Sequence, residues 1–346
     1  MTWLTWRQFR APALTVLIGL AVFGIALAVT GPPLAQEYHL SGLATCTANA
    51  SCATAQQTFA LQVRQTGVDL PLYFLGIIAT YLIAALIGMF WAAPLVAREL
   101  ETGTFRLAWT QSVTRTRWLA VKLTLIGLTA TVATGLLSLA VTWWSHPIDL
   151  ANARPAADAG LALPARFAPL VFGSRGVVPI GYAAFAFLLG VAAGIVVRRT
   201  LPAMGLTLAV LASVQVLIPA VLRPHYQPSA VSTMALVLTP DRPQSLQLRD
   251  GKLTVVAPVT MPGAWITSVH TVDSAGRTAA PAIPQACADP AGTVVDCDQA
   301  INALNLRQRI TYQPADRFWV FQWYELGLYL ALTALLTALC VRRIRR

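Results

Sequence analysis

The sequence predicts an all-α polytopic membrane protein with six transmembrane helices and a small α+β domain between the fifth and the sixth. Hydrophobic residues make up 56% of the chain and charged residues only 11%, whereas soluble domains carry about 25% charged residues. Six apolar runs approach or exceed the length of about 20 residues that a bilayer requires. We expect the spans at 13–30, 72–97, 123–144, 180–197, 203–222 and 321–341.

The basic residues indicate how the chain is oriented. The net charge is +11, and cytoplasmic segments of membrane proteins retain an excess of Lys and Arg. The positive residues flank spans and do not form one stripe, which argues against a nucleic-acid partner. We therefore expect a multi-pass protein of the plasma membrane with both termini in the cytoplasm. The segments assigned to the cytoplasm hold Arg7, Arg10, Arg98, Arg106, Arg115, Arg117, Lys122, Arg198, Arg199, Arg342, Arg343, Arg345 and Arg346.

Residues 1–12 are predicted to form an interfacial helix ahead of the first span. Trp3, Trp6 and Phe9 recur at every third position with two arginines beside them, a pattern that places rings and guanidinium groups among lipid headgroups. An ordinary anchor for the first span is the alternative. The apolar run that follows is longer than the about 7 to 15 residues of a signal peptide's core, so we expect a retained span.

The cysteines support the same topology. Cys46 and Cys52 lie in the predicted first outer loop, and Cys287 and Cys297 lie in the last. Disulfides persist in oxidising compartments, so two close pairs outside the cell predict two disulfides, with free thiols as the alternative. No cysteine or histidine spacing is typical of a metal site.

The third span carries a stripe of small and hydroxyl side chains. The members recur at steps of three and four residues, which places them on one helix face. Such a stripe lets membrane helices pack closely, and a role in lining a translocation path is the alternative. Gly190 and Gly194 give the fourth span a weak signal for close helix contact. The stripe consists of Thr124, Gly127, Thr131, Thr134, Ser138 and Thr142.

The segment 223–320 is predicted to be a folded extracellular domain. Polar and apolar residues alternate over 247–255 on both sides of the Asp250–Gly251 pair. This pattern is a strong signal for a β-hairpin. A second alternating run covers 265–271, and we expect a helix after Cys297. The chain then divides into the interfacial helix 1–12, spans one to five over 13–222 with the cytoplasmic loop 98–122, the domain 223–320, and the sixth span with its basic tail over 321–346.

The predicted spans lack the residues of an intramembrane catalytic site. All four histidines fall outside the predicted spans, so we find no base and nucleophile within reach of each other in the membrane. No GxxxxGK[ST] motif occurs, so any nucleotide would bind to another subunit. Glu325 is the one acidic or basic residue within a predicted span. It lies near the outer edge, and we expect it at the membrane interface.

Three motifs resemble those of type-2 ABC exporter permeases. The loop between the second and third spans carries Arg98–Glu99, Gly103–Thr104, Leu107, Arg115 and Lys122 at the spacing of that family's cytoplasmic loop. Arg198–Met204, which reads Arg-Arg-Thr-Leu-Pro-Ala-Met, follows the fourth span. Gln313–Trp319, which reads Gln-Pro-Ala-Asp-Arg-Phe-Trp, precedes the sixth. The domain 223–320 is larger than is usual in the family, which leaves the substrate open.

The resemblance implies a transmembrane subunit without enzymatic activity that exports a substrate when cytoplasmic ABC ATPase subunits hydrolyse ATP. ATP and magnesium would bind to those subunits and not to this chain, and the other partners would be membrane lipid and a second permease half, identical or different. The loop would form a coupling helix that contacts the ATPase, with Gly103 allowing a break or a close approach. A membrane-anchored receptor or sensor with an extracytoplasmic ligand-binding domain is the alternative function. The predicted contact residues are Arg98, Glu99, Leu100, Glu101, Gly103, Thr104, Phe105, Arg106, Leu107, Trp109 and Arg115.

Overall fold

The structure is a computed structural model of the whole chain. It describes residues 2–47, 49–103, 114–154, 164–237, 245–249, 252–256, 261–279, 281–282, 284–288 and 293–345.

Six helices in the described residues are long and apolar enough to cross a membrane, as the sequence predicts. Because helices satisfy their own backbone hydrogen bonds, they can cross lipid. Two of the six are joined pieces in which a short π-helical segment continues the α-helix. The six are α1 (Thr2–Leu40), α3 (Asp69–Leu86) with η1 (Ile87–Ala92) and α4 (Ala93–Thr102), α6 (Arg115–Asn152), α8 (Val178–Val197), α9 (Thr200–Leu217) with η3 (Ile218–Leu222) and η4 (Arg223–His225), and α12 (Phe318–Arg345).

Several helices extend beyond the predicted spans. α1 continues to Leu40, and α2 (Asn49–Gln65) follows in the region predicted as an outer loop. α6 runs to Asn152 with Pro147 inside it, although proline usually interrupts a helix. Residues 2–12 are continuous with the first long helix, and their position in the membrane interface stays a prediction.

α8 forms the centre of the bundle. In the most apolar 18-residue stretch of α8, 78% of the residues are buried, whereas the corresponding share is 11% in the first span and 17% in the span that contains α9. Its closest neighbours are α12, α4 and η1. Glycines allow this contact: a Cβ on Gly190 would lie 2.9 Å from the backbone nitrogen of Ala93, and one on Gly194 would lie 2.8 Å from the Ala93 oxygen. The predicted close contact through these two glycines is confirmed.

The segment between α9 and α12 is an α+β domain. β1 (Ala230–Ala235), β5 (Arg307–Gln313) and β4 (Trp265–Val272) form an antiparallel sheet in that order. The predicted hairpin is confirmed as β2 (Ser245–Arg249) paired with β3 (Lys252–Val256), while Asp250 and Gly251 lie outside the described residues.

Short helices accompany these strands. α10 (Gln285–Ala288) and α11 (Val294–Asn302) precede β5, and α7 (Pro169–Phe172) precedes α8. The helix predicted after Cys297 begins earlier in the chain than expected. α11 starts at Val294 because the Thr293 side chain and Asp296 cap its first turn reciprocally, the arrangement that starts many helices.

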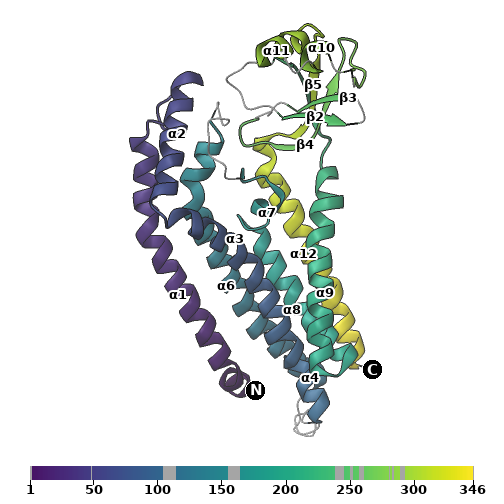
Figure 1. Cartoon of the computed structure of the whole chain (residues 1–346). Helices are drawn as coiled ribbons and strands as arrows, with labels where there is room; N and C mark the ends of the chain where they lie inside the picture. Colours follow the sequence, from purple (N-terminus) through teal and green to yellow (C-terminus); the bar gives the residue numbers. More distant parts are fainter. Residues whose placement is uncertain are drawn as a thin grey trace.

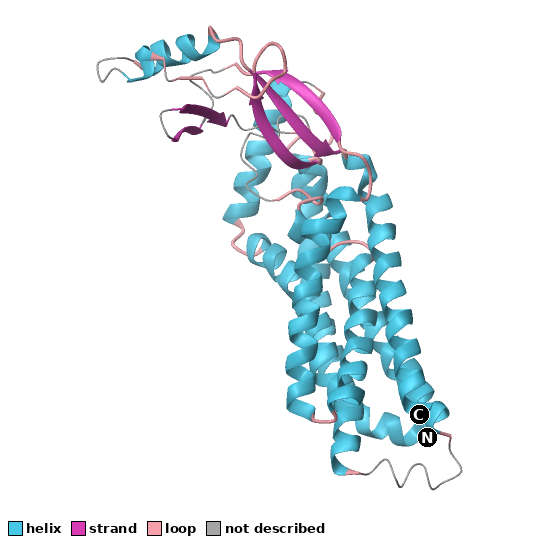
Figure 2. Ribbon diagram, turned by 90° about the vertical axis from the view of Figure 1, so that its right-hand side faces the viewer, coloured by secondary structure: helices cyan, strands magenta, loops and turns pink. Residues whose placement is uncertain are grey.

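The two ends of the bundle carry different elements. Figure 1 shows both chain termini near the free end of α4, and the strands at the opposite end of the long helices. Figure 2, turned by 90°, shows the same separation. We call these the loop end and the domain end. Both termini and the free end of α4 therefore share one end, as the charge pattern requires, and the domain lies at the other.

Both predicted disulfides are present. Cys46 pairs with Cys52 and Cys287 with Cys297, and Cys340 is unpaired. Replacing Cys287 and Cys297 by serine is expected to lower the free energy of unfolding of the domain by about 2–3 kcal/mol, because the unfolded chain gains loop freedom. Protease resistance of the domain in urea measures this. Cys340→Ser, in α12, is the matched control, and an equal loss in both variants would contradict a specific role for the disulfide.

Candidate functional site

Gly103 ends α4 at the loop end of the bundle. Its φ is +74°, a left-handed conformation that glycine adopts without strain. A Cβ there would meet no atom of the described residues within 4 Å. Of the two roles expected for Gly103, the left-handed φ fits a break in the helix, and a close approach to a partner stays a prediction. The predicted coupling helix is assigned to the loop 98–122, of which residues 104–113 lie outside the described residues.

Glu99 connects α4 to α6. Its carboxylate accepts a hydrogen bond from the Lys122 ammonium in an ion pair. Lys122 is buried, and its Nζ also lies 4.4 Å from the centre of the Trp118 ring. A buried cation needs a partner of opposite charge, so this pair holds the start of α6 against the end of α4.

Glu101 connects α4 to α9. Its Oε2 accepts hydrogen bonds from the backbone nitrogen of Thr200 at 3.1 Å and from the Thr200 hydroxyl at 2.8 Å. Thr200 is the first residue of α9, where unpaired N–H groups favour a carboxylate. The preceding turn is tight because Arg198 takes a left-handed φ of 55°. The motif at 198–204 and the entrance to the loop are therefore in direct contact.

The remaining predicted loop residues are only partly described. Arg98 is exposed, and Leu100 is half-buried against the main apolar core. Arg115 begins α6, but its side chain is not described. The predicted contact residues outside the described part of the chain are Thr104, Phe105, Arg106, Leu107 and Trp109.

The hydroxyl stripe of the third span lies on α6, and much of it bonds within the chain. The hydroxyls of Thr124, Thr131, Thr134 and Thr142 donate to the carbonyl four residues earlier. A Cβ on Gly127 would lie 3.0 Å from the Phe187 ring of α8. The hydroxyl bonds lie within α6, and Gly127 lets α6 approach α8 closely. A translocation path along the stripe stays a hypothesis.

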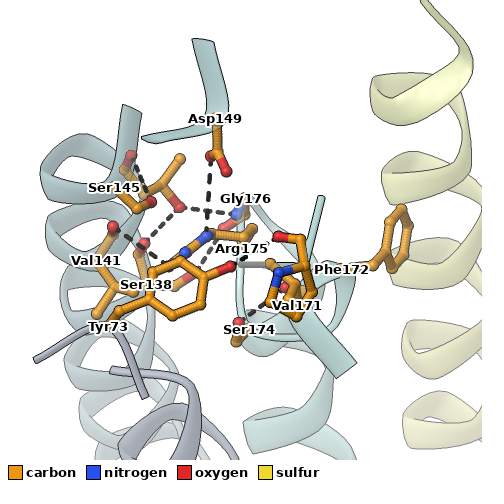
Figure 3. A network of polar contacts seen from close by, with 12 residues as sticks. Tyr73, Ser138, Val141, Ser145, Asp149, Val171, Phe172, Ser174, Arg175 and Gly176 are labelled. Carbon is orange, nitrogen blue, oxygen red and sulfur yellow. Dashed lines mark hydrogen bonds and ion pairs between the residues drawn. The ribbon is translucent and has the colours of Figure 1, made fainter. Parts of the chain in front are cut away.

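Ser138 and Thr142 hold the turn that leads into α8. The Ser138 hydroxyl donates to the Gly176 oxygen at 2.8 Å, and the Gly176 nitrogen donates to the Thr142 hydroxyl at 2.9 Å. Figure 3 shows this network, in which Arg175 lies between Asp149 and Tyr73. The turn is thereby tied to α6.

Arg175 is buried in this turn but only loosely paired. Its Nε lies 3.9 Å from Asp149 Oδ2, beyond hydrogen-bond distance. Its Nη1 donates to the Val141 oxygen at 3.5 Å, and its guanidinium lies 5.1 Å from the Tyr73 ring centre. Within the described residues, Nε, Nη2 and Asp149 Oδ1 have no hydrogen-bond partner.

Gln322 of α12 caps the same turn from the other side. Its Oε1 accepts hydrogen bonds from the backbone nitrogens of Val177 and Val178, and its Nε2 donates to the Phe172 oxygen at 2.9 Å. The side chain thus satisfies N–H groups at the start of α8 that the helix itself leaves free. One turn of backbone therefore joins α6, α8 and α12.

Glu325 is buried within the protein near the start of α12, and its depth in the membrane stays a prediction. Its side chain and that of Arg223 are both 0% exposed. Arg223 donates to it through Nε at 2.8 Å and through Nη2 at 2.9 Å, and the Tyr182 hydroxyl donates to Oε1 at 2.9 Å. This two-pronged geometry is the strongest form of an ion pair between these residue types.

Sequence reasoning therefore misses a polar layer at the domain end. From the sequence, Glu325 is assigned to the membrane interface and Arg223 to the start of the domain 223–320, and Arg175 is not singled out. One signal could have predicted the ion pair. Arg223 directly follows one apolar run and Glu325 lies inside another, and charges within spans are usually paired.

The motif at 313–319 also lies at this end. Gln313 donates from Nε2 to the Gln227 oxygen at 2.9 Å and accepts from Arg317 at 2.8 Å. Arg317 donates to the Pro228 oxygen at 2.6 Å. These bonds attach the start of α12 to the segment that links α9 to β1, so the motif fixes the domain on the bundle.

Comparison with known proteins identifies a family. A family model described as "ABC-2 membrane transporter related" matches residues 17–223. The match covers the long helices from α1 to α9, the loop entrance at 98–103 and the turn at 198–204, and it ends before the domain and α12. No curated protein and no solved structure matches the chain.

Proposed function

Because the chain belongs to the ABC-2 membrane transporter related family, we propose that it is the permease subunit of an ATP-driven exporter. A transporter permease of this kind is a multi-pass membrane component. ATP hydrolysis and the Mg²⁺ it requires would be supplied by separate cytoplasmic ABC ATPase subunits. Nothing in the comparisons favours the receptor or sensor function.

The observation that carries the proposal is the double attachment of α4 at the loop end. Glu99 joins α4 to α6, and Glu101 joins it to α9. A protein that displaced the loop after Gly103 would therefore move three spans together. Coupling of this kind needs a connected set of contacts between the site that is pushed and the elements that move.

The two carboxylates act within the chain in this proposal. The sequence predicts that Glu99 and Glu101 contact the ATPase, but each already accepts hydrogen bonds from another helix. They transmit the movement, while the exposed Arg98 and the residues that follow Gly103 contact the ATPase. With the loop end in the cytoplasm, both termini are cytoplasmic and the domain is extracellular. A second permease half completes the transporter.

The experiment separates assembly from coupling. The permease is co-expressed with its ATPase subunits, and both pull-down and permease-dependent ATP hydrolysis are measured. Gly103→Pro is expected to abolish pull-down, because proline fixes φ near −65° where the chain needs +74°. Glu101→Gln and Thr200→Val weaken the contact between Glu101 and Thr200, so each is expected to preserve pull-down and to lower coupled hydrolysis severalfold.

Gly205→Ala, on α9, is the matched control, because a Cβ there meets no atom within 4 Å. Glu99→Ala tests the second attachment. Normal assembly and normal coupled hydrolysis in both Glu99→Ala and Gly103→Pro would exclude the coupling role.

A further inference from the structure

One edge of the three-stranded sheet is open. The strand order is β1-β5-β4, so β1 is an edge strand, and among the described residues β5 is the only strand that pairs with it. Figure 2 shows these strands at the domain end of the bundle. Val231 of β1 is 60% exposed, so the strand is accessible to solvent. An open edge presents a row of unpaired N–H and C=O groups to which another chain can bind.

The strand register identifies the backbone groups that face the open edge. The Leu236 nitrogen donates to the Leu306 oxygen at 3.0 Å, so these two residues form a hydrogen-bonded pair that continues the ladder of β1 and β5. Such pairs alternate along antiparallel strands, and the residues between them direct their N–H and C=O groups away from β5. In β1 these residues are Val231, Thr233 and Ala235.

β1 carries none of the features that usually protect an edge strand. Its sequence, Ala-Val-Ser-Thr-Met-Ala, contains no charged residue and no proline, and its register with β5 runs without a bulge. Charged side chains, prolines and bulges are the common devices that stop an edge from pairing with another chain. Their absence favours an edge that accepts a strand, as in domains that bind peptides by strand addition.

One face of the sheet beside this edge is cationic. Arg307 and Arg309 are two residues apart on β5, so their side chains lie on the same face. Both are exposed, and neither has an ion pair within the described residues. Their partners on β1 are Ala235 and Thr233, whose small side chains leave the arginines room to reach toward the open edge.

No acidic residue of the sheet neutralises these arginines. The described strands β1, β4 and β5 contain no Asp or Glu, and the β4 partner of Arg309 is His270. Asp273, in the turn after β4, already binds Arg277. Carboxylates form strong hydrogen-bonded pairs with guanidinium groups. The face therefore complements a chain that carries acidic side chains at every second residue, the same spacing as the two arginines.

We propose that β1 binds an extended acidic segment of a partner protein, which adds to the sheet as a further antiparallel strand. The backbone groups of Val231, Thr233 and Ala235 pair with the segment, and Arg307 and Arg309 bind its carboxylates. The added strand lies two strand spacings, about 10 Å, from β5, a gap that an arginine and a glutamate side chain span together.

A second copy of this chain is a poorer occupant of the edge. Pairing of β1 with β1 brings no carboxylate to the arginines, because β1 contains no acidic residue. The binding that we propose stands apart from transport. Only the side of the membrane on which the partner lies depends on the proposed topology, which places it outside the cell.

The test uses the full-length protein in phosphatidylcholine nanodiscs and a fluorescent peptide of alternating glutamate and threonine, with binding measured by fluorescence anisotropy. We expect this peptide to bind, and a peptide with lysine in place of glutamate not to bind. Arg307→Gln and Arg309→Gln are each expected to raise the Kd by about two- to fivefold, the effect of one exposed charge pair, and the double variant should raise it further. Arg64→Gln, at an exposed position of α2, is the matched control and should bind as the unchanged protein does.

N-methylated peptides test the backbone pairing separately from the charge. In the proposed antiparallel register, the glutamates share the face of Arg307 and Arg309, and their N–H groups point toward β1. Methylation of the glutamate nitrogens should therefore abolish binding, whereas methylation of the threonine nitrogens should leave it unchanged. Thr233→Pro removes a donor that faces the open edge and should weaken binding as well. Variants are compared only where gel filtration and disulfide content match the unchanged protein.

Equal binding of the two methylated peptides would overturn the proposal, because strand addition requires a difference between them. The proposal also fails if the glutamate peptide does not bind, or if the double arginine variant binds it as tightly as Arg64→Gln does. A dimer that forms without peptide and dissociates in Thr233→Pro, seen by analytical ultracentrifugation, would assign the edge to a second copy of the chain instead.

Discussion

Glu325→Ala is expected to lower the free energy of unfolding by about 3–5 kcal/mol, the largest effect that we expect of any single side-chain truncation in this chain. The change leaves the Arg223 guanidinium fully buried without its counter-charge, and removes the acceptor of the Tyr182 hydroxyl. Fluorescence-detected gel filtration after stepwise heating in detergent measures the loss.

The double variant Arg223→Met with Glu325→Leu separates charge from packing. Replacing both partners of a buried ion pair by apolar residues is often neutral, so the double variant is expected to recover most of the stability. Asp273→Asn is the control, because Asp273 pairs with an Arg277 whose side chain is 81% exposed, and exposed pairs contribute little. A double variant as unstable as Glu325→Ala would show that the residues act through shape and not through charge.

Gly190→Val is expected to be the most damaging change in the centre of the bundle. A Cβ at this position would collide with the Gly88 carbonyl oxygen and lie 2.7 Å from the Ala92 Cβ and 2.9 Å from the Ala93 nitrogen. Backbone atoms cannot rotate away, so α8 must separate from η1 and α4. Overpacking of this kind costs about 1–3 kcal/mol and occasionally more.

The lower stability of Gly190→Val should appear as a lower yield of folded protein and a lower midpoint temperature in gel filtration after heating. Gly205→Ala is again the matched control, since it adds a methyl group to a helical glycine with free space around it. Alanine is also the better helix former, so this control is expected to equal or exceed the unchanged protein. Equal stability of Gly190→Val and Gly205→Ala would contradict the close packing of α8 on η1 and α4.

The two glycines of α8 also bear on function. Gly190 and Gly194 hold α8 against η1 and α4, and α4 carries the two carboxylates at the loop end. α8 is in turn hydrogen-bonded at the domain end to Gln322 and Glu325 of α12. A movement of the loop after α4 would therefore act on a helix that contacts both ends of the bundle. In the proposed exporter, movement at the loop end would reach the domain end through this central helix.

The sequence by itself determined the features that depend on local composition and spacing. Six apolar runs predicted six long helices, and the alternation at 247–255 predicted the β2–β3 hairpin. Two close cysteine pairs predicted both disulfides. The motifs at 98–122 and 198–204 indicated the family that the match over 17–223 shows. The predicted helix ends were less accurate, because α1 and α6 continue through polar residues beyond the apolar run that spans the bilayer.

Only the tertiary structure decided which polar groups meet. Arg223 and Glu325 are 102 residues apart in the sequence, and Glu101 and Thr200 are 99 apart. Such helices are apolar on nearly every side, so the hydrophobic pattern does not indicate which face turns inward. A cavity lined by Tyr81 of α3, Leu170 of α7, Val216 of α9 and Trp265 of β4 likewise forms only where these four elements converge. Composition places a helix in the membrane, but its neighbours are set by close packing between particular side chains.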